Sequence, residues 1–263
     1  MAPILFVSHG SPMLAIDDSP AHGFLQTLGK ELPRPSAILV VSAHWERAGE
    51  FGVTTGAHPE TIHDFSGFPR ELEDMVWPAP GALQLADQCL AALQRAGIQA
   101  VGDARRGFDH GVWVPLSIMF PAADVPVCQV SLLRGASMEA HCALGRALRE
   151  AIPDDALVVC SGSMTHNLYE AMGKTEAAAE AGWSREFADW VGDALVDRRL
   201  NDLLDYRIRA PWGRRNHPSA EHIAPLFVAL GIAGPEFSAR PLFRGVVHGV
   251  IAMDSWVLQE KAA

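Results

Sequence analysis

Five runs of β-type apolar residues constrain the fold more than any other feature of this sequence. They lie at residues 4–7, 37–42, 127–132, 156–160 and 245–253. The early runs are apolar at successive positions instead of alternating with polar residues, which is typical of strands buried on both faces. The sequence therefore predicts a sheet that is covered on both sides.

Segments with helical features lie between several of these runs. Residues 81–96 are rich in Ala, Leu and Gln, residues 137–151 and 184–205 carry apolar residues at helical spacing, and residues 219–230 precede Gly231, a helix stop signal. Strands that alternate with helices predict an α/β fold with a central, largely parallel (mixed) sheet. No linker divides the chain, so we expect residues 1–263 to form a single three-layer α/β/α domain.

The composition excludes several classes of function. A net charge of −10 argues against the basic footprint of a nucleic-acid-binding protein and against binding to an anionic membrane surface. No apolar run is long enough to cross a bilayer. The four cysteines have the spacing of neither a disulfide framework nor a zinc ribbon, which indicates buried thiols in a reducing compartment. We expect a cytoplasmic protein, monomeric or homo-oligomeric, that acts on a small molecule.

Three histidines follow apolar runs at similar positions. His9, His44 and His166 each come just after a predicted strand. Ligands of open α/β sheets bind beyond the carboxyl ends of the strands, so parallel neighbours would bring these imidazoles to one edge. One histidine at a strand end is more often structural, but three in the same position favour a function. Because neutral histidine is the commonest ligand type for metal ions, the pattern predicts a metal site.

A fourth histidine lies in the segment HPSAEHIAPLF. Pro218 and Ser219 predict the start of a helix, which places His222 in the first turn, where the helix dipole favours a neutral imidazole. Its neighbours His217 and Glu221 compete for the same role. Spacing alone leaves the choice among the three open.

Two further histidines lie in loops of mixed aromatic and polar character. His63 in TIHDFSGFP and His110 in GFDHGVW are both flanked by Gly, Phe and Asp. This composition is typical of a small-molecule pocket in which an aromatic wall meets a polar group. The alternative is that Asp64 and Asp109 only orient neighbouring turns. The chain has no Walker loop and no GxGxxG motif, which argues against a nucleotide cofactor.

Six motifs together resemble those of a known family. SHGSPM, VVSAHW, TIHDFSGFP, GFDHGVW, THNL and PSAEHIAPLF occur in this order along the chain. They are similar to motifs of the class III extradiol ring-cleavage dioxygenases, specifically the branch that includes 4,5-DOPA extradiol dioxygenase. The resemblance runs from residue 3 to about residue 254. Each motif is weak alone, and their joint order makes the resemblance specific.

The resemblance implies an activity and a set of site residues. It implies an enzyme with one mononuclear divalent metal, Fe(II) for activity and Zn(II) in purified protein, held by His9, His44 and His222. His166 would be the acid–base residue, close enough to the metal to count as a fourth ligand. His110 would line the substrate pocket as a second catalytic residue. The substrates would be a small aromatic diol (a catechol) and O2, and the product a ring-opened semialdehyde.

Alternatives remain open at this point. Protocatechuate-cleaving relatives use two histidines and a glutamate, so Glu221 could replace His222 as the third ligand. The scaffold could also support a zinc-dependent hydrolase with His166 or Glu221 as the base, or a metal-binding interaction protein without turnover. DOPA, protocatechuate, gallate and simpler catechols are all candidate substrates. Three arginines are candidates to bind a substrate carboxylate, with solvated surface residues as the alternative for each: Arg105, Arg106 and Arg214.

Overall fold

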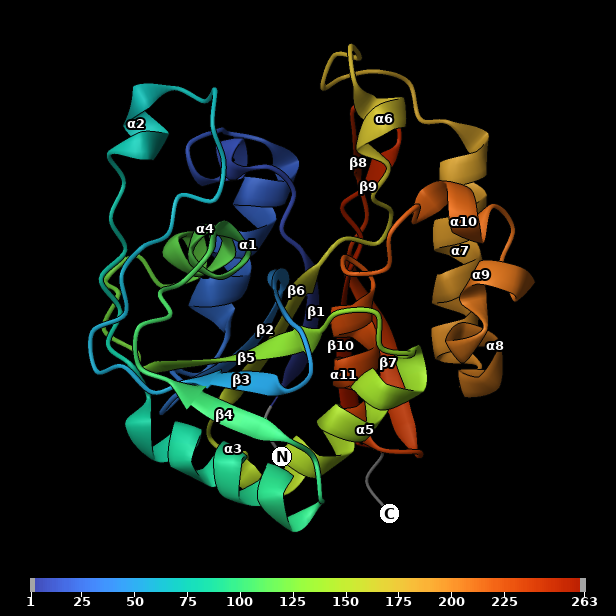
Figure 1. Ribbon diagram of the computed structural model, residues 1–263. Coiled ribbons are helices and arrows are strands. Elements are labelled where there is room, and N and C mark those ends of the chain that lie inside the picture. The colour runs from blue at the N-terminus through green and yellow to red at the C-terminus, as the bar shows by residue number, and fades with distance from the viewer. Residues whose placement is uncertain (1–2, 261–263) are drawn as a thin grey trace.

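The computed structural model describes residues 3–260, and eight strands form its central sheet (Figure 1). They are β1 (Ile4–Ser8), β2 (Ile38–Arg47), β3 (Phe51–Thr54), β4 (Ala100–Asp103), β5 (Val127–Leu133), β6 (Leu157–Gly162), β7 (Phe237–Phe243) and β10 (Ser255–Glu260). Their order is β4-β3-β5-β2-β6-β1-β10-β7. The pairs β2–β5, β2–β6, β1–β6 and β3–β4 are parallel, whereas β3–β5, β1–β10 and β10–β7 are antiparallel. The predicted α/β class with a largely parallel, mixed sheet is therefore confirmed.

Helices cover both faces of this sheet. They are α1 (Pro20–Glu31), α2 (Arg70–Glu73), α3 (Leu83–Arg95), α4 (His110–Met119), α5 (Met138–Leu148), α6 (Leu168–Ala171), α7 (Gly182–Val196), α8 (Leu200–Leu204), α9 (Tyr206–Arg209), α10 (Gly213–Asn216) and α11 (Ala224–Ala233), with 3-10 turns η1 (Pro12–Ala15) and η2 (Arg149–Ala151). Helices α1 and α4 contribute to the core on one face, and α3, α5, α7 and α11 to the core on the other. None of the helices among residues 3–260 is long and apolar enough to cross a membrane.

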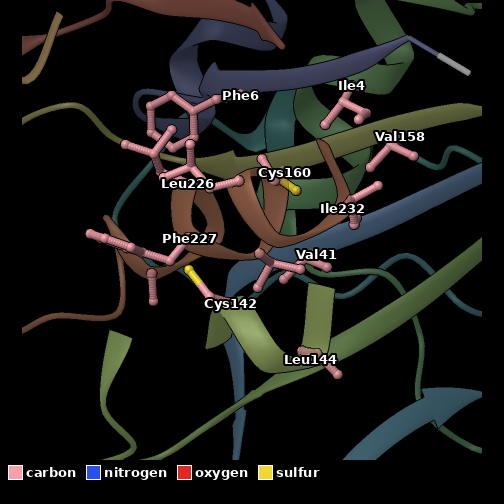
Figure 2. Close-up of a cluster of buried hydrophobic side chains, with 14 of the residues drawn as sticks. Ile4, Phe6, Val41, Cys142, Leu144, Val158, Cys160, Leu226, Phe227 and Ile232 are labelled. Carbon is pink, nitrogen blue, oxygen red and sulfur yellow. The ribbon is translucent and has the colours of Figure 1, made fainter. Parts of the chain in front are cut away.

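Successive residues of the central strands enter two separate hydrophobic cores. In β1, Ile4 and Phe6 belong to one core, and Leu5 and Val7 belong to the other. Figure 2 shows the first core, where Phe6 lies near Leu226 of α11 and Ile4 lies near Val158 of β6. A fully buried Leu or Phe side chain contributes about 1.5–3 kcal/mol through the hydrophobic effect. Burial on both faces explains why these strands are apolar at every position.

Helix α11 differs at both ends from the helix predicted at residues 219–230. It begins later, and it continues through Gly231 to a cap at Gly234, whose φ is 80°. Gly231 packs against α5, because a Cβ atom at this position would lie only 2.1 Å from the carbonyl oxygen of Cys142. This glycine therefore permits the close approach of two helices and does not end one.

The last predicted strand, residues 245–253, is also different. It consists of two short antiparallel strands, β8 (Val246–Val247) and β9 (Ile251–Ala252). His248 and Gly249 lie between them with φ values of 51° and 65°. The prediction of one continuous strand was wrong because this turn divides the apolar run.

Candidate active site

The carboxyl ends of β1, β2 and β6 bring His9, His44 and His166 to one edge of the sheet. His9 directly follows β1, and its backbone N–H donates to the carbonyl of Gly162 at the end of β6 over 3.0 Å. His166 lies beyond β6, and its backbone N–H donates to the carbonyl of Asn216 over 3.0 Å. The arrangement follows from the parallel pairing of neighbouring strands, as the sequence predicted.

His44 lies at an interruption of the β2–β5 ladder. Val41 pairs with Val130 and Glu46 pairs with Leu132, so five steps along β2 (41 to 46) correspond to two steps along β5 (130 to 132). Extra residues of this kind bend a strand and reorient its side chains, often next to a functional site. The irregularity therefore lies at the position where His44 faces the other histidines.

Three imidazole nitrogens meet at this edge. The Nε2 atom of His44 lies 3.1 Å from Nε2 of His9 and 3.3 Å from Nε2 of His222. His222 lies in a turn just before α11 and not, as predicted, in the first turn of that helix. Its carbonyl accepts the backbone N–H of Ser163 over 2.8 Å, which ties this turn to the end of β6.

A chain of hydrogen bonds determines which nitrogen of His9 carries the proton. The hydroxyl of Ser161 donates to the carbonyl of Gly111, a group that can only accept. The hydroxyl proton is then used, so the 2.9 Å contact between Ser161 Oγ and His9 Nδ1 requires Nδ1–H to donate. The Nε2 atom of His9 therefore presents a lone pair.

Carboxylates act in the same way on the other two rings. Oε1 of Glu221 lies 2.9 Å from Nδ1 of His222 and accepts a hydrogen bond from its Nδ1–H group. Oδ2 of Asp64 lies 3.4 Å from Nδ1 of His44, a longer contact that favours the Nδ1–H form electrostatically. Both arrangements leave Nε2 as the atom available to a metal, as is usual for metal-binding histidines whose other ring nitrogen donates to a carboxylate.

The two Nε2–Nε2 separations around His44 fit a divalent cation. Nitrogens that both lack a proton cannot hydrogen-bond to each other, so their close approach is unfavourable unless a cation lies between them. Metal–nitrogen bonds of about 2.0–2.1 Å place adjacent ligand nitrogens about 3 Å apart. The separations of 3.1 and 3.3 Å around His44 agree with this value. The donor set therefore suits a metal such as Fe(II) or Zn(II).

Burial keeps these imidazoles neutral. It lowers the pKa of His9 and of His222 well below the ordinary value, and the neighbouring histidines lower both further. Burial also lowers the pKa of His44 to about 4 and that of His166 to about 4. Because a metal binds the neutral ring, these side chains are in the binding form at neutral pH.

His110, at the start of α4, lies beside two of these rings. Its ring centroid is 5.4 Å from that of His9 and 3.9 Å from that of His44. Its Nδ1 and its backbone N–H lie 2.9 and 3.0 Å from Oδ1 of Asp64. Burial alone raises the pKa of Asp64, but its hydrogen bonds with His110 outweigh this effect and lower the pKa to about 2. Asp64 is therefore a carboxylate at neutral pH.

Aromatic rings extend the site beyond His110. The centroid of Phe65 lies 5.9 Å from that of His110 and 6.1 Å from that of Trp113. His63 lies 5.6 Å from Phe65, and its Nε2 is 3.0 Å from the carbonyl oxygen of Met75. These contacts form the aromatic wall beside a polar group that the TIHDFSGFP and GFDHGVW segments predicted.

His166 stacks on His222, with centroids 3.4 Å apart and planes 9° apart. No hydrogen bond joins the ring of His166 to another group among residues 3–260, in contrast to the rings of His9, His110 and His222. Two groups of side chains that could bind a metal lie here. The first is His9, His44 and His110, the second is His166, Glu221 and His222, and the ligand atoms within each group lie within 4.8 Å of one another. The contact between His44 and His222 joins the two groups.

Some residues considered in the sequence lie elsewhere or have other partners. His217 is buried in the core, and its Nε2 lies 2.9 Å from the carbonyl oxygen of Met164. Arg106 forms an ion pair of 2.7 Å with the buried Asp109, so its charge is used within the protein. The other two arginine candidates, Arg105 and Arg214, are exposed.

The Nδ1 partner of His9 was not predicted from the sequence, and the partners of His222 and His44 were not assigned. Ser161 approaches His9 because β1 and β6 pair in parallel with Val7 opposite Ser161. Glu221 contacts Nδ1 of His222, and its adjacency in sequence was the only available signal. Asp64 was interpreted only as a residue that orients a turn, and its place in the DFSGF loop gave no indication of two imidazole partners.

Comparison with known proteins agrees with this fold. Residues 3–248 match the family model described as the catalytic LigB subunit of aromatic ring-opening dioxygenase. A 4,5-DOPA dioxygenase extradiol of Beta vulgaris is 37% identical over 255 residues, covering 95% of this chain and 94% of the relative. A protein of the same description from Escherichia coli K12 is 37% identical over 258 residues, covering 95% and 92%. The crystal structure of an uncharacterized Escherichia coli K12 protein superposes with a TM-score of 0.82 at 31% identity, covering 98% of this chain and all of that one.

The family match and the descriptions of these relatives thus define an aromatic ring-opening dioxygenase of the extradiol class. The chain belongs to the LigB family, which its match over residues 3–248 shows. The family resemblance and the enzyme class that the sequence predicted are confirmed.

Proposed function

We propose that residues 1–263 form one catalytic domain, a metal-dependent dioxygenase that opens the ring of a catechol with O2. The observation that carries this proposal is the approach of three Nε2 atoms, with 3.1 and 3.3 Å between neighbours and a separate Nδ1 partner for each ring. The relatives described as 4,5-DOPA dioxygenase extradiol support a small aromatic diol as the substrate class. The product would be a ring-opened semialdehyde.

In this proposal His9, His44 and His222 hold one divalent metal, Fe(II) for activity and Zn(II) as an occupant of the purified protein. When bound, the metal would act as a Lewis acid and carry electrons between the aromatic diol and O2. Glu221 is not a ligand in this proposal, because its carboxylate accepts a hydrogen bond from Nδ1–H of His222. The neutral state of the three buried rings supports this assignment.

His110 and His166 have different roles in the proposal. The Nδ1–H group of His110 donates to Asp64, so its Nε2 can accept a proton from a substrate hydroxyl. The ring of His166 has no hydrogen-bond partner among the described residues, so it is free to take up a proton and return it during ring opening. A positioned acid–base residue of this kind typically accelerates a reaction about 10²- to 10⁴-fold.

The aromatic wall supports a planar substrate. Phe65 lies beside His110, where it can pack against an aromatic ring and exclude water from it, and the buried Trp113 supports Phe65 from behind. Aromatic pairs of this kind contribute about 0.5–1.5 kcal/mol beyond the area that they bury. The wall therefore favours binding of the ring, while the imidazoles bind and orient its hydroxyl groups.

The direct test is oxygen uptake. The protein is loaded with Fe(II) without air, mixed with each member of a catechol panel and then exposed to O2. The proposal predicts O2 consumption and a yellow ring-opened product. If no catechol is turned over, while the zinc-loaded protein hydrolyses esters or amides, a hydrolase is the correct function. If neither activity is found, the protein binds a metal without turnover.

The division of roles has its own test in two variants. His44→Ala removes a nitrogen that faces both His9 and His222, so we expect loss of the metal. His166→Ala should retain the metal and lose turnover about 10²- to 10⁴-fold. Metal content measured by mass spectrometry separates the two. An equal loss of metal in both variants would show that His166 is a ligand.

A further inference from the structure

We propose that Asp64 is a positioning residue that controls a metal-binding ring and a substrate-side ring through the two oxygens of one carboxylate. This inference rests on the proposed function and extends it. Oδ1 of Asp64 lies 2.9 Å from Nδ1 of His110, and Oδ2 lies 3.4 Å from Nδ1 of His44. The two rings are 3.9 Å apart between centroids, so one anion faces both.

The orientation of the Asp64 carboxylate is fixed from the His110 side. The backbone N–H of His110 and its Nδ1 lie 3.0 and 2.9 Å from the same oxygen, Oδ1. Turning the carboxylate away would leave both donors of a buried residue without a partner, at about 1–3 kcal/mol for each. Oδ1 is therefore held by His110, and Oδ2 remains for His44.

The consequence for each ring is a choice of tautomer. A carboxylate can only accept, so it selects the Nδ1–H form of His110 and leaves the Nε2 lone pair for a substrate hydroxyl. The same charge favours the Nδ1–H form of His44, which leaves Nε2 free for the metal. In the absence of this charge, Nε2–H of His44 could donate to Nε2 of His9, 3.1 Å away, and the metal-binding lone pair would be lost.

The Asp64→Asn variant replaces one carboxylate oxygen by an NH2 group without changing the shape of the side chain. It therefore tests the roles of the two oxygens separately. Because both donors of His110 need an acceptor, the amide oxygen must take the place of Oδ1. The amide NH2 group then faces Nδ1 of His44, where it donates and stabilises the Nε2–H form. We expect the affinity for Zn²⁺ to fall about 10- to 100-fold, the usual effect of changing such a partner. His110 should keep its tautomer.

The experiment measures two quantities in the full-length protein. Zn²⁺ affinity is measured by competition with a chromophoric chelator in the wild type, Asp64→Asn and Asp64→Ala. The control is Asp74→Asn, because Asp74 is an exposed carboxylate that pairs with Arg70 on α2. The ¹⁵N shifts of the His110 ring are measured in the metal-free protein and assigned by their loss in His110→Gln.

The proposal expects Asp64→Asn to lose at least tenfold in Zn²⁺ affinity while Asp74→Asn binds like the wild type. It also expects His110 to be protonated at Nδ1 in the wild type and in Asp64→Asn, and to be a mixture of forms in Asp64→Ala. Unchanged Zn²⁺ affinity in Asp64→Asn overturns the role at His44, and a wild-type His110 protonated at Nε2 overturns the role at His110. A wild type that binds no Zn²⁺ overturns the proposed function instead, and the ring shifts still decide whether Asp64 controls His110.

Discussion

Ser161 holds His9 in the tautomer that exposes Nε2. Its hydroxyl oxygen lies 2.9 Å from Nδ1 of His9, while its proton is donated to the carbonyl of Gly111. A side chain at the end of β6 thus controls a ring at the end of β1, and both groups are buried.

Ser161→Ala should therefore weaken metal binding. The variant leaves the Nδ1–H group of His9 without its acceptor and removes the preference for the metal-binding form. We expect Zn²⁺ affinity to fall about 10- to 100-fold, measured by competition titration. Ser117→Ala is the matched control, because the hydroxyl of Ser117 donates to the carbonyl of Val114 within α4 and has no other hydrogen-bond partner among residues 3–260. Equal affinity in both variants would argue against the role of Ser161.

Replacing His222 should have a larger effect than replacing Glu221. His222→Ala removes one of three facing nitrogens, so we expect a loss of Zn²⁺ affinity greater than the about 10- to 100-fold that is typical of changing a ligand's outer partner. Glu221→Gln keeps an oxygen near Nδ1 of His222 and should lose less than tenfold. Isothermal titration calorimetry measures the Zn²⁺ affinity of both variants and shows which of them loses more. The opposite order would identify Glu221 as the third ligand.

Gly111→Ala should displace His44. A Cβ atom at this position would lie 2.3 Å from Oγ of Ser42 and 3.1 Å from Cδ2 of His44. We expect a loss of about 1–3 kcal/mol in the free energy of unfolding, as for overpacking in a core, together with weaker Zn²⁺ binding. In Gly23→Ala, on α1, the added methyl group meets no atom within 4 Å, so this variant should be neutral or more stable by up to about 1 kcal/mol. Urea unfolding measures both, and similar stabilities would contradict the prediction.

The metal-free protein should lose stability as the pH falls below the ordinary histidine range. Burial lowers the pKa of His44 and of His166 to about 4 and that of His217 to about 3. In the unfolded chain these rings take up protons near pH 6.5, whereas in the folded protein they stay neutral, so acid favours the unfolded state. Between pH 6.5 and 5 we expect the free energy of unfolding to fall by at least about 1.4 kcal/mol per pH unit, the value for one such ring. Urea unfolding at several pH values measures this slope, and a flat profile would contradict it.

The parts of the fold that the sequence predicted are those buried on both faces. Strands β1, β2, β5 and β6 consist largely of buried residues, so their apolar runs are unbroken at the start. Strands β4 and β7 lie at the two edges of the sheet and are partly exposed, so no apolar run marks them. Helix α4 was missed because it is buried on all sides and contains Pro115, which leaves no polar face to reveal a helical period.

At the site, the sequence predicted the imidazoles better than their partners. The position of a histidine after an apolar run is visible in a single sequence, and this was sufficient for His9, His44 and His166. The Nδ1 partners depend on long-range contacts, such as the register of β1 against β6 for Ser161 and the return of residues 61–69 over α4 for Asp64. Neither the strand register nor the path of residues 61–69 can be read from the local spacing of residues. The metal-binding and catalytic roles themselves stay predictions until the variants are measured.

The contact between His44 and His222 joins residues 178 positions apart in the chain. A cation held there would cross-link segments that are distant in any unfolded state, so its binding energy would add to the free energy of folding. At a free metal concentration 1,000 times the dissociation constant, this gain is about 4.1 kcal/mol. The supply of that metal would then affect the heat tolerance of the enzyme and its lifetime in the presence of proteases, as well as its rate.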